Sequence, residues 1–157
     1  MNDNNLFLIL RQEPLGYPVH VVDYRVENTL GARVAAARKA RGIRSTKALS
    51  ELIGNGTITE ATLQNSETGR LTNLSVSQLL NNAFALKVAP SFLLAPLGLP
   101  SAHVDLPSLS DGLNRMNVSE FDGWLTGAND GRYRPTSAAE IDERTQLEAL
   151  RALENLM

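Results

Sequence analysis

The chain has 157 residues, a formal net charge of −2 and no cysteine. This length fits one domain, or a small domain with an appendage. The lack of cysteine excludes disulfide bonds, thiolate catalysis and cysteine-ligated metal sites. His20 and His103, the two histidines, lie far apart without ligand-spaced neighbours, so we expect no metal and no cofactor.

The net acidity argues against nucleic acid, but the charge is unevenly distributed. Residues 1–26 carry a net charge of −1, residues 27–98 carry +4, and the remainder carries −5. A basic block of this kind is typical of a module that contacts phosphates. We interpret the acidic remainder as ordinary solvated surface.

The N-terminal region predicts a β-hairpin. Residues 6–10 and 19–24 are short, apolar and rich in β-branched or aromatic side chains, and residues 14–18 form a proline- and glycine-containing turn. An isolated hairpin is marginally stable, so this one either covers its own domain or pairs with a second subunit. Residues 6–10 are too few for a membrane span of about 20 residues and lack the basic flank of a signal peptide. We therefore expect a cytoplasmic protein.

Two helices are predicted next. The first is capped by Asn28 or Thr29 and ends at Gly42. The second runs from Ser45 or Thr46 to about residue 53, with Ala48, Leu49 and Ile53 facing inward. In the first helix, the residues that share one face at helical spacing are Leu30, Val34 and Ala37. The arginines that we expect on or near its solvent side are Arg33, Arg38 and Arg41.

A third helix is predicted over about residues 59–66, with Leu63 as its one apolar anchor and Gly69 at its end. Its outward face carries amide, hydroxyl and carboxylate groups, from Thr59, Glu60, Thr62, Gln64 and Asn65. Such a face is a poor core element and suits a helix that hydrogen-bonds to base edges in a groove. The competing interpretation is an ordinary polar surface helix.

The first and third helices carry a family resemblance. The motif Leu-Gly-x-Arg-Val-x-x-Ala-Arg-x-x-Arg-Gly-Ile at residues 30–43, and Glu-x-Gly-Arg at residues 67–70, follow the order and spacing of helix-turn-helix proteins. Residues 28–97 resemble the phage-repressor type (lambda-repressor-like, Xre family). The chain departs from that pattern in a connection about two residues longer between the second and third helices. It also has Ser66 where the family usually has an apolar residue.

The resemblance implies a five-helix domain whose third helix reads the major groove of double-stranded DNA. The expected base contacts are Glu60, Ala61 and Asn65, with Thr59, Thr62 and Gln64 beside them. Asn and Gln pair with adenine, Ala61 can touch a thymine methyl, and Glu60 can accept only from cytosine and is repelled by phosphate. The expected phosphate contacts are Arg38, Arg44, Ser45, Thr46, Lys47, Thr68, Arg70 and Asn73. For Ser45, Thr46 and Lys47 taken singly, a helix cap and a solvated lysine are equally good interpretations.

Two further helices are predicted to belong to the core. Ser75 caps the fourth, and Pro90 begins the fifth, which contains Phe92, Leu93 and Leu94. The fourth has a broad apolar side made of Val76, Leu79, Leu80, Ala83, Phe84 and Leu86. Such spacing usually reflects packing.

The C-terminal part divides into three pieces. Residues 98–117 are rich in proline, glycine and serine and form a linker or an irregular crossing. A short helix follows over about residues 118–125, with Trp124 as its anchor. A capping box at residues 137–140 opens a last helix whose apolar stripe is Leu147, Leu150, Leu153 and Met157. That stripe either finds a core or forms a dimer seam.

These observations predict a mainly α protein with four segments. They are a β-hairpin arm (1–27), a helix-turn-helix domain (28–97), a linker (98–117) and a helical C-terminal segment (118–157). We expect a sequence-specific DNA-binding regulator of phage or bacterial repressor type. It would act by occluding a promoter, as a homodimer through the hairpin or the last helix. The alternative is a helical, antitoxin-like or partner-binding module. We expect no enzyme, since no phosphate loop or catalytic arrangement is present.

Overall fold

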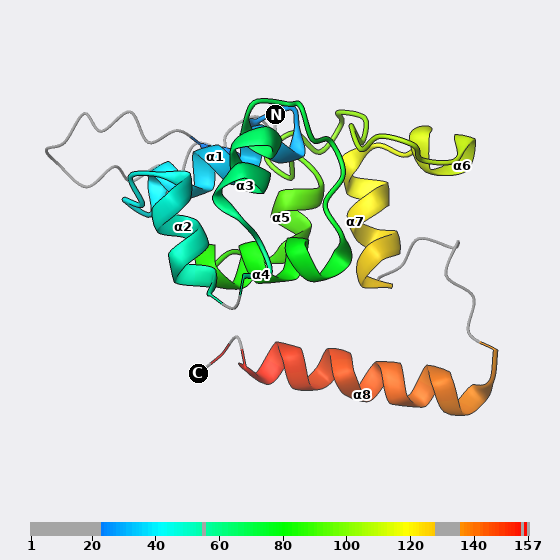
Figure 1. Ribbon diagram of the computed structural model, residues 1–157. Helices are drawn as coiled ribbons and strands as arrows, with labels where there is room; N and C mark the ends of the chain where they lie inside the picture. Colours follow the sequence, from blue (N-terminus) through cyan, green and yellow to red (C-terminus); the bar gives the residue numbers. More distant parts are fainter. Residues whose placement is uncertain (1–22, 55, 128–135, 155, 157) are drawn as a thin grey trace, which may run out of the picture.

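A computed structural model describes residues 23–54, 56–127, 136–154 and 156 of the chain (Figure 1). Within these residues the secondary structure is helical, apart from an isolated bridge between His103 and Asn117. The prediction of a mainly α protein is therefore confirmed. Most of the predicted β-hairpin lies outside the described residues. Its last residue, Tyr24, begins a 3-10 helix instead of ending a strand.

The helices follow one another with short connections. In chain order they are η2 (Tyr24–Val26), α1 (Leu30–Ala40), α2 (Thr46–Ile53), α3 (Glu60–Glu67), α4 (Val76–Leu86), α5 (Pro90–Leu94), α6 (Asp111–Asn114), α7 (Val118–Thr126) and α8 (Ala138–Glu154).

The first four α-helices each begin after a hydroxyl side chain. Thr29, Ser45, Thr59 and Ser75 accept a hydrogen bond from the backbone N–H three residues later, which satisfies a donor that the helix itself leaves unpaired. The predicted caps Thr29, Ser45 and Ser75 are confirmed. At the start of α8, the hydroxyl of Ser137 accepts a hydrogen bond from the N–H of Glu140. The carboxylate of Glu140 in turn accepts one from the N–H of Thr136.

Helices α1 to α5 surround one apolar core. Its buried residues are Leu30, Val34, Ala37, Leu49, Ile58, Leu63, Leu79, Ala83, Leu86 and Leu93. The prediction that the whole apolar side of α4 packs inward is wrong. Val76, Leu80 and Phe84 are 73%, 49% and 86% exposed. The apolar positions of α4 form two adjacent stripes, and only the one that starts at Leu79 faces the core.

Two of the arginines expected on the solvent side of α1 are buried. Arg33 is fully buried because its guanidinium has partners for its fork of donors. It donates to the backbone oxygens of Glu27, Leu93 and Leu94 and pairs with Asp105 at 3.0 Å. Carbonyls at the end of a short helix such as α5 lack partners within the helix, and Arg33 supplies them.

Of the other two arginines of α1, one is buried and one is exposed. Arg38 is 7% exposed and contacts α3. Arg41 stays exposed, as expected, and donates to the backbone oxygens of Leu86 and Lys87 at the end of α4. The prediction of solvent exposure is wrong for Arg33 and Arg38, because their long side chains reach acceptors in the interior.

Residues 98–117 pack against the end of α5 and against α7, and contact α1 through Asp105. Val104 and Met116 join Ala95, Val118 and Phe121 in a second apolar cluster, and Asp105 holds Arg33. Prolines and glycines keep this segment irregular, while its apolar side chains are buried. Of the two interpretations, a linker or an irregular crossing, the packing favours the crossing.

Helix α8 contributes no buried residue among those described. Leu147, Leu150 and Leu153 are 47%, 58% and 60% exposed, and α8 runs along the lower edge of Figure 1, apart from α4. These three leucines therefore have no core in this arrangement, and Met157, the fourth residue of the predicted stripe, lies outside the described residues. In the described part of the chain, no helix has the length and apolarity needed to cross a membrane.

Candidate nucleic-acid interface

Helix α3 packs on the core through a narrow buried face. Leu63 and Ser66 are its buried residues, and Ile58, in the preceding connection, is also buried. The hydroxyl of Ser50 in α2 donates to the carbonyl oxygen of Ile58 at 2.7 Å. This bond fixes the longer connection between α2 and α3 against α2.

Small residues bring α1 and α3 into backbone contact. A Cβ added to Gly31 would lie 1.9 Å from the carbonyl oxygen of Ser66, which is far inside van der Waals contact. Ser66 is 1% exposed, and its hydroxyl has no hydrogen-bond partner within the described residues. Glycine is therefore required at position 31 of this crossing.

The opposite side of α3 is open to solvent. Ala61 and Gln64 are exposed, and Glu60, Thr62 and Asn65 are half-buried. The helix ends at Glu67 and is capped by Thr68. Gly69 then takes a left-handed conformation (φ +75°), and the N–H of Leu71 donates to the carbonyl oxygen of Asn65. This end fits the glycine cap that the sequence indicated.

The polar groups on this face are partly engaged with one another. Gln64 Nε2 donates to Glu60 Oε1 at 3.2 Å, and the Thr59 and Thr62 hydroxyls lie 2.9 Å apart in a hydrogen bond. The Asn65 side chain has no hydrogen-bond partner in the part of the chain that the structure describes. The structure thus brings all six expected base-reading residues onto one helix and its cap, with Asn65 the least constrained.

Arg38 does not fit its expected role as a phosphate contact. Its Nε and Nη2 donate to the two carboxylate oxygens of Glu67, both at 2.7 Å, and Nη1 donates to the carbonyl of Ile43. The bidentate Glu67 bond raises the pKa of Arg38 above its usual range. Arg38 therefore ties the end of α1 to the end of α3. Sequence reasoning missed the role of Glu67, although its charge is opposite to that of Arg38.

The other expected phosphate contacts surround the two ends of the α2–α3 unit. Arg44, Ser45 and Lys47 are exposed at the start of α2, and Thr68, Arg70 and Asn73 are exposed after α3. Thr46 is only 9% exposed, so its side chain is not presented to a ligand. Ser45 serves as the cap of α2, and Lys47 lies 4.0 Å from Glu51, both well exposed.

The burial of Arg33 and Arg38 does not remove the basic character of this region, because each is matched by its own carboxylate. The basic residues of residues 27–98 that remain exposed are Lys39, Arg41, Arg44, Lys47, Arg70 and Lys87. Exposed positive charge is what a phosphate-contacting surface requires.

Comparisons of the chain with protein-family models, with curated proteins and with solved structures gave no match.

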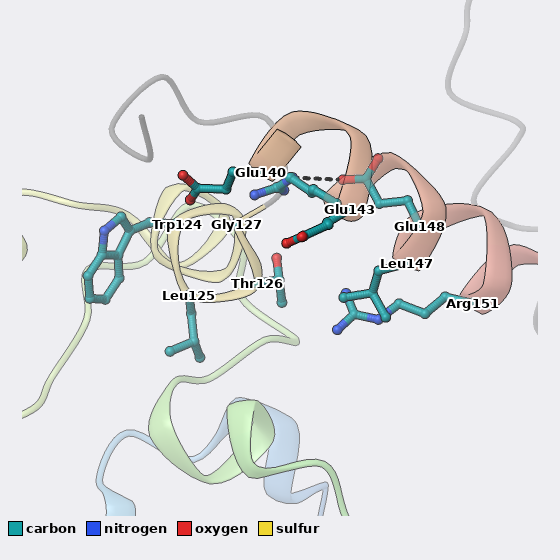
Figure 2. Close-up of a pocket in the computed structure, with 10 residues that line it drawn as sticks. Trp124, Leu125, Thr126, Gly127, Glu140, Glu143, Leu147, Glu148 and Arg151 are labelled. Atoms are coloured by element: carbon teal, nitrogen blue, oxygen red, sulfur yellow. Dashed lines mark hydrogen bonds and ion pairs between the residues drawn. The ribbon is translucent and has the colours of Figure 1, made fainter. Parts of the chain in front are cut away.

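A concave feature lies between α7 and α8. It is an open groove of about 390 Å³ with Trp124 and Leu125 on one side and Glu143, Leu147 and Arg151 of α8 on the other (Figure 2). Among the described residues, its lining includes no histidine, no cysteine and no serine. These side chains offer an amphipathic surface and no recognisable catalytic arrangement.

Proposed function

We propose that the chain is a sequence-specific DNA-binding transcriptional regulator, of phage or bacterial repressor type. The observation that carries this proposal is the outward face of α3. It presents Ala61 and Gln64 to solvent, with the half-buried Asn65 beside them, from a helix whose back is fixed by Leu63. A rigid helix that carries amide side chains fits the major groove and the donor and acceptor pattern of base edges.

The arrangement of the neighbouring helices supports the same proposal. We interpret α1 to α5 as a lambda-repressor-like domain in which α2 and α3 form the helix-turn-helix. Arg44 and Lys47 at the start of α2, and Arg70 beyond α3, would then fix the register on phosphates while α3 selects the sequence. Occupying a promoter in this way excludes polymerase, which is the simplest mechanism of repression.

A repressor of this type would bind as a homodimer on two half-sites about 34–36 Å apart. Two segments can supply the dimer contact. One is the exposed leucine stripe of α8, and the other is the predicted hairpin, which lies outside the described residues.

The test is selection from random duplexes followed by sequencing, with wild type, Asn65→Ala and Asn81→Ala in parallel. Asn81 is an exposed asparagine on α4 and serves as the matched control. We expect an enriched motif that becomes degenerate at one position in Asn65→Ala and is unchanged in Asn81→Ala. The loss of discrimination should be about 1–3 kcal/mol at that base. Absence of any enriched motif for the wild type would contradict the proposal.

The second candidate function is a helical protein-interaction module, antitoxin-like or partner-binding. The exposed apolar stripe of Val76, Leu80 and Phe84 on α4 favours it, because contiguous exposed apolar surface marks interaction sites. Retention on heparin distinguishes the two functions. Binding to DNA phosphates weakens steeply with salt, whereas an apolar protein interface does not.

A further inference from the structure

The hydrogen bond between Glu60 and Gln64 determines how this pair presents itself to a ligand. A carboxylate can only accept, so the Gln64 amide must direct its nitrogen toward Glu60. One N–H of the amide is then occupied. The other N–H and Oε1 have no partner among the described residues, and a donor and an acceptor on one amide are the combination that pairs with N7 and N6 of adenine.

Glu60 brings a negative charge to the face that would enter the groove. Its only hydrogen-bond partner among the described residues is Gln64, and none of the ion pairs in that part of the chain involves it. It is the first residue of α3, where the helix dipole stabilises a carboxylate. A docked Glu60 therefore needs a hydrogen-bond donor from the DNA.

The major groove offers such donors on two bases, so adenine must be added to the cytosine that the sequence alone predicts for Glu60. Cytosine presents its N4 amino group and adenine its N6 amino group, while guanine and thymine present acceptors. An acceptor facing Glu60 would leave the carboxylate desolvated and repelled, which penalises the wrong base more than a missing contact would.

Building on the proposed function, we propose that Glu60 is a specificity-determining residue. It selects a base with an exocyclic amino group on the strand that it faces. Gln64, held in place by its hydrogen bond to Glu60, reads a neighbouring adenine. The pair thus acts as one unit of readout at adjacent positions of the operator. The same unit excludes guanine and thymine opposite Glu60.

The experiment is selection from random duplexes with wild type, Glu60→Gln and Glu51→Gln. Glu51 is an exposed carboxylate on α2, so its variant removes the same charge away from the reading face. We expect a wild-type position enriched about tenfold in cytosine or adenine over guanine and thymine. Glu60→Gln should lose that enrichment, because an amide both donates and accepts, and Glu51→Gln should retain it. Duplexes that differ only at this base then show whether cytosine or adenine supplies the amino group.

Two further variants separate the partners. Glu60→Asp keeps a carboxylate and should retain the amino-base preference with weaker binding. Gln64→Ala should lose adenine enrichment at the neighbouring position only. A wild-type motif that is unchanged in Glu60→Gln overturns this inference and leaves the proposed function standing. A wild type without any motif overturns the proposed function, and this inference with it.

Discussion

Arg33 joins three segments that are distant in the sequence: η2 through the carbonyl of Glu27, the end of α5, and the crossing through Asp105. We expect Arg33→Met to destabilise the fold by about 3 kcal/mol, because it leaves buried carbonyls without donors. Asp105→Asn should cost only about 1 kcal/mol, since that side chain is 26% exposed and the amide retains an acceptor. Urea unfolding of both variants, followed by circular dichroism, tests this order. Similar losses in both would contradict it.

The burial of Arg33 illustrates what the sequence could show at this scale. Leu30, Arg33 and Ala37 have the spacing of one helix face. An arginine side chain is usually exposed, however, and the sequence therefore predicts Arg33 on or near the solvent side. The Arg38–Glu67 pair and the unpaired hydroxyl of Ser66 depend on contacts between α1 and α3, which no local pattern contains. By contrast, Gln64 follows Glu60 by four residues, a spacing that does predict a contact on a helix.

At the scale of elements, the position of α3 depends on its crossing with α1. We expect Gly31→Ala to destabilise the fold by about 1–3 kcal/mol, because the added methyl meets the backbone of Ser66 and forces the helices apart. The cost of this clash exceeds the gain of about 1 kcal/mol that alanine brings to a helix relative to glycine. Gly112→Ala in α6 is the matched control, since its Cβ would meet nothing within 4 Å. It should be neutral or slightly stabilising, and a Gly31→Ala protein as stable as this control would refute the crossing. Chemical denaturation midpoints provide the measurement.

The helices themselves were largely predictable. Hydroxyl caps, glycine and proline gave the starts of α1, α2, α4 and α5 closely, because these signals act within one turn of chain. The four-residue helix α6 was missed inside the predicted linker. The sequence also failed to show which apolar stripe of α4 is buried, since that is decided by where α2 and α5 lie.

At the scale of the whole molecule, charge is unevenly distributed along the chain. Six exposed basic residues lie in residues 27–98, while the acidic C-terminal part carries the exposed leucines of α8. No periodic pattern could predict that this stripe lacks a core, because its burial depends on a partner surface elsewhere. Two copies joined through α8 would cover these leucines and hold two reading helices at once.

We therefore expect Leu150→Glu to shift the protein from dimer to monomer in sedimentation equilibrium. The free energy of unfolding of the monomer should change little, because Leu150 is 58% exposed. Leu80→Glu on α4 is the control, with a similar exposure of 49%, and should leave the dimer intact.

The consequence of dimer loss for DNA affinity follows from effective concentration. Once one half-site is bound, the second binding event is intramolecular, so loss of the dimer should weaken binding to a paired site about 100-fold or more while binding to a single half-site changes little. A dimer that survives Leu150→Glu would exclude α8 as its contact. Loss of the dimer in Leu80→Glu alone would place the contact on α4.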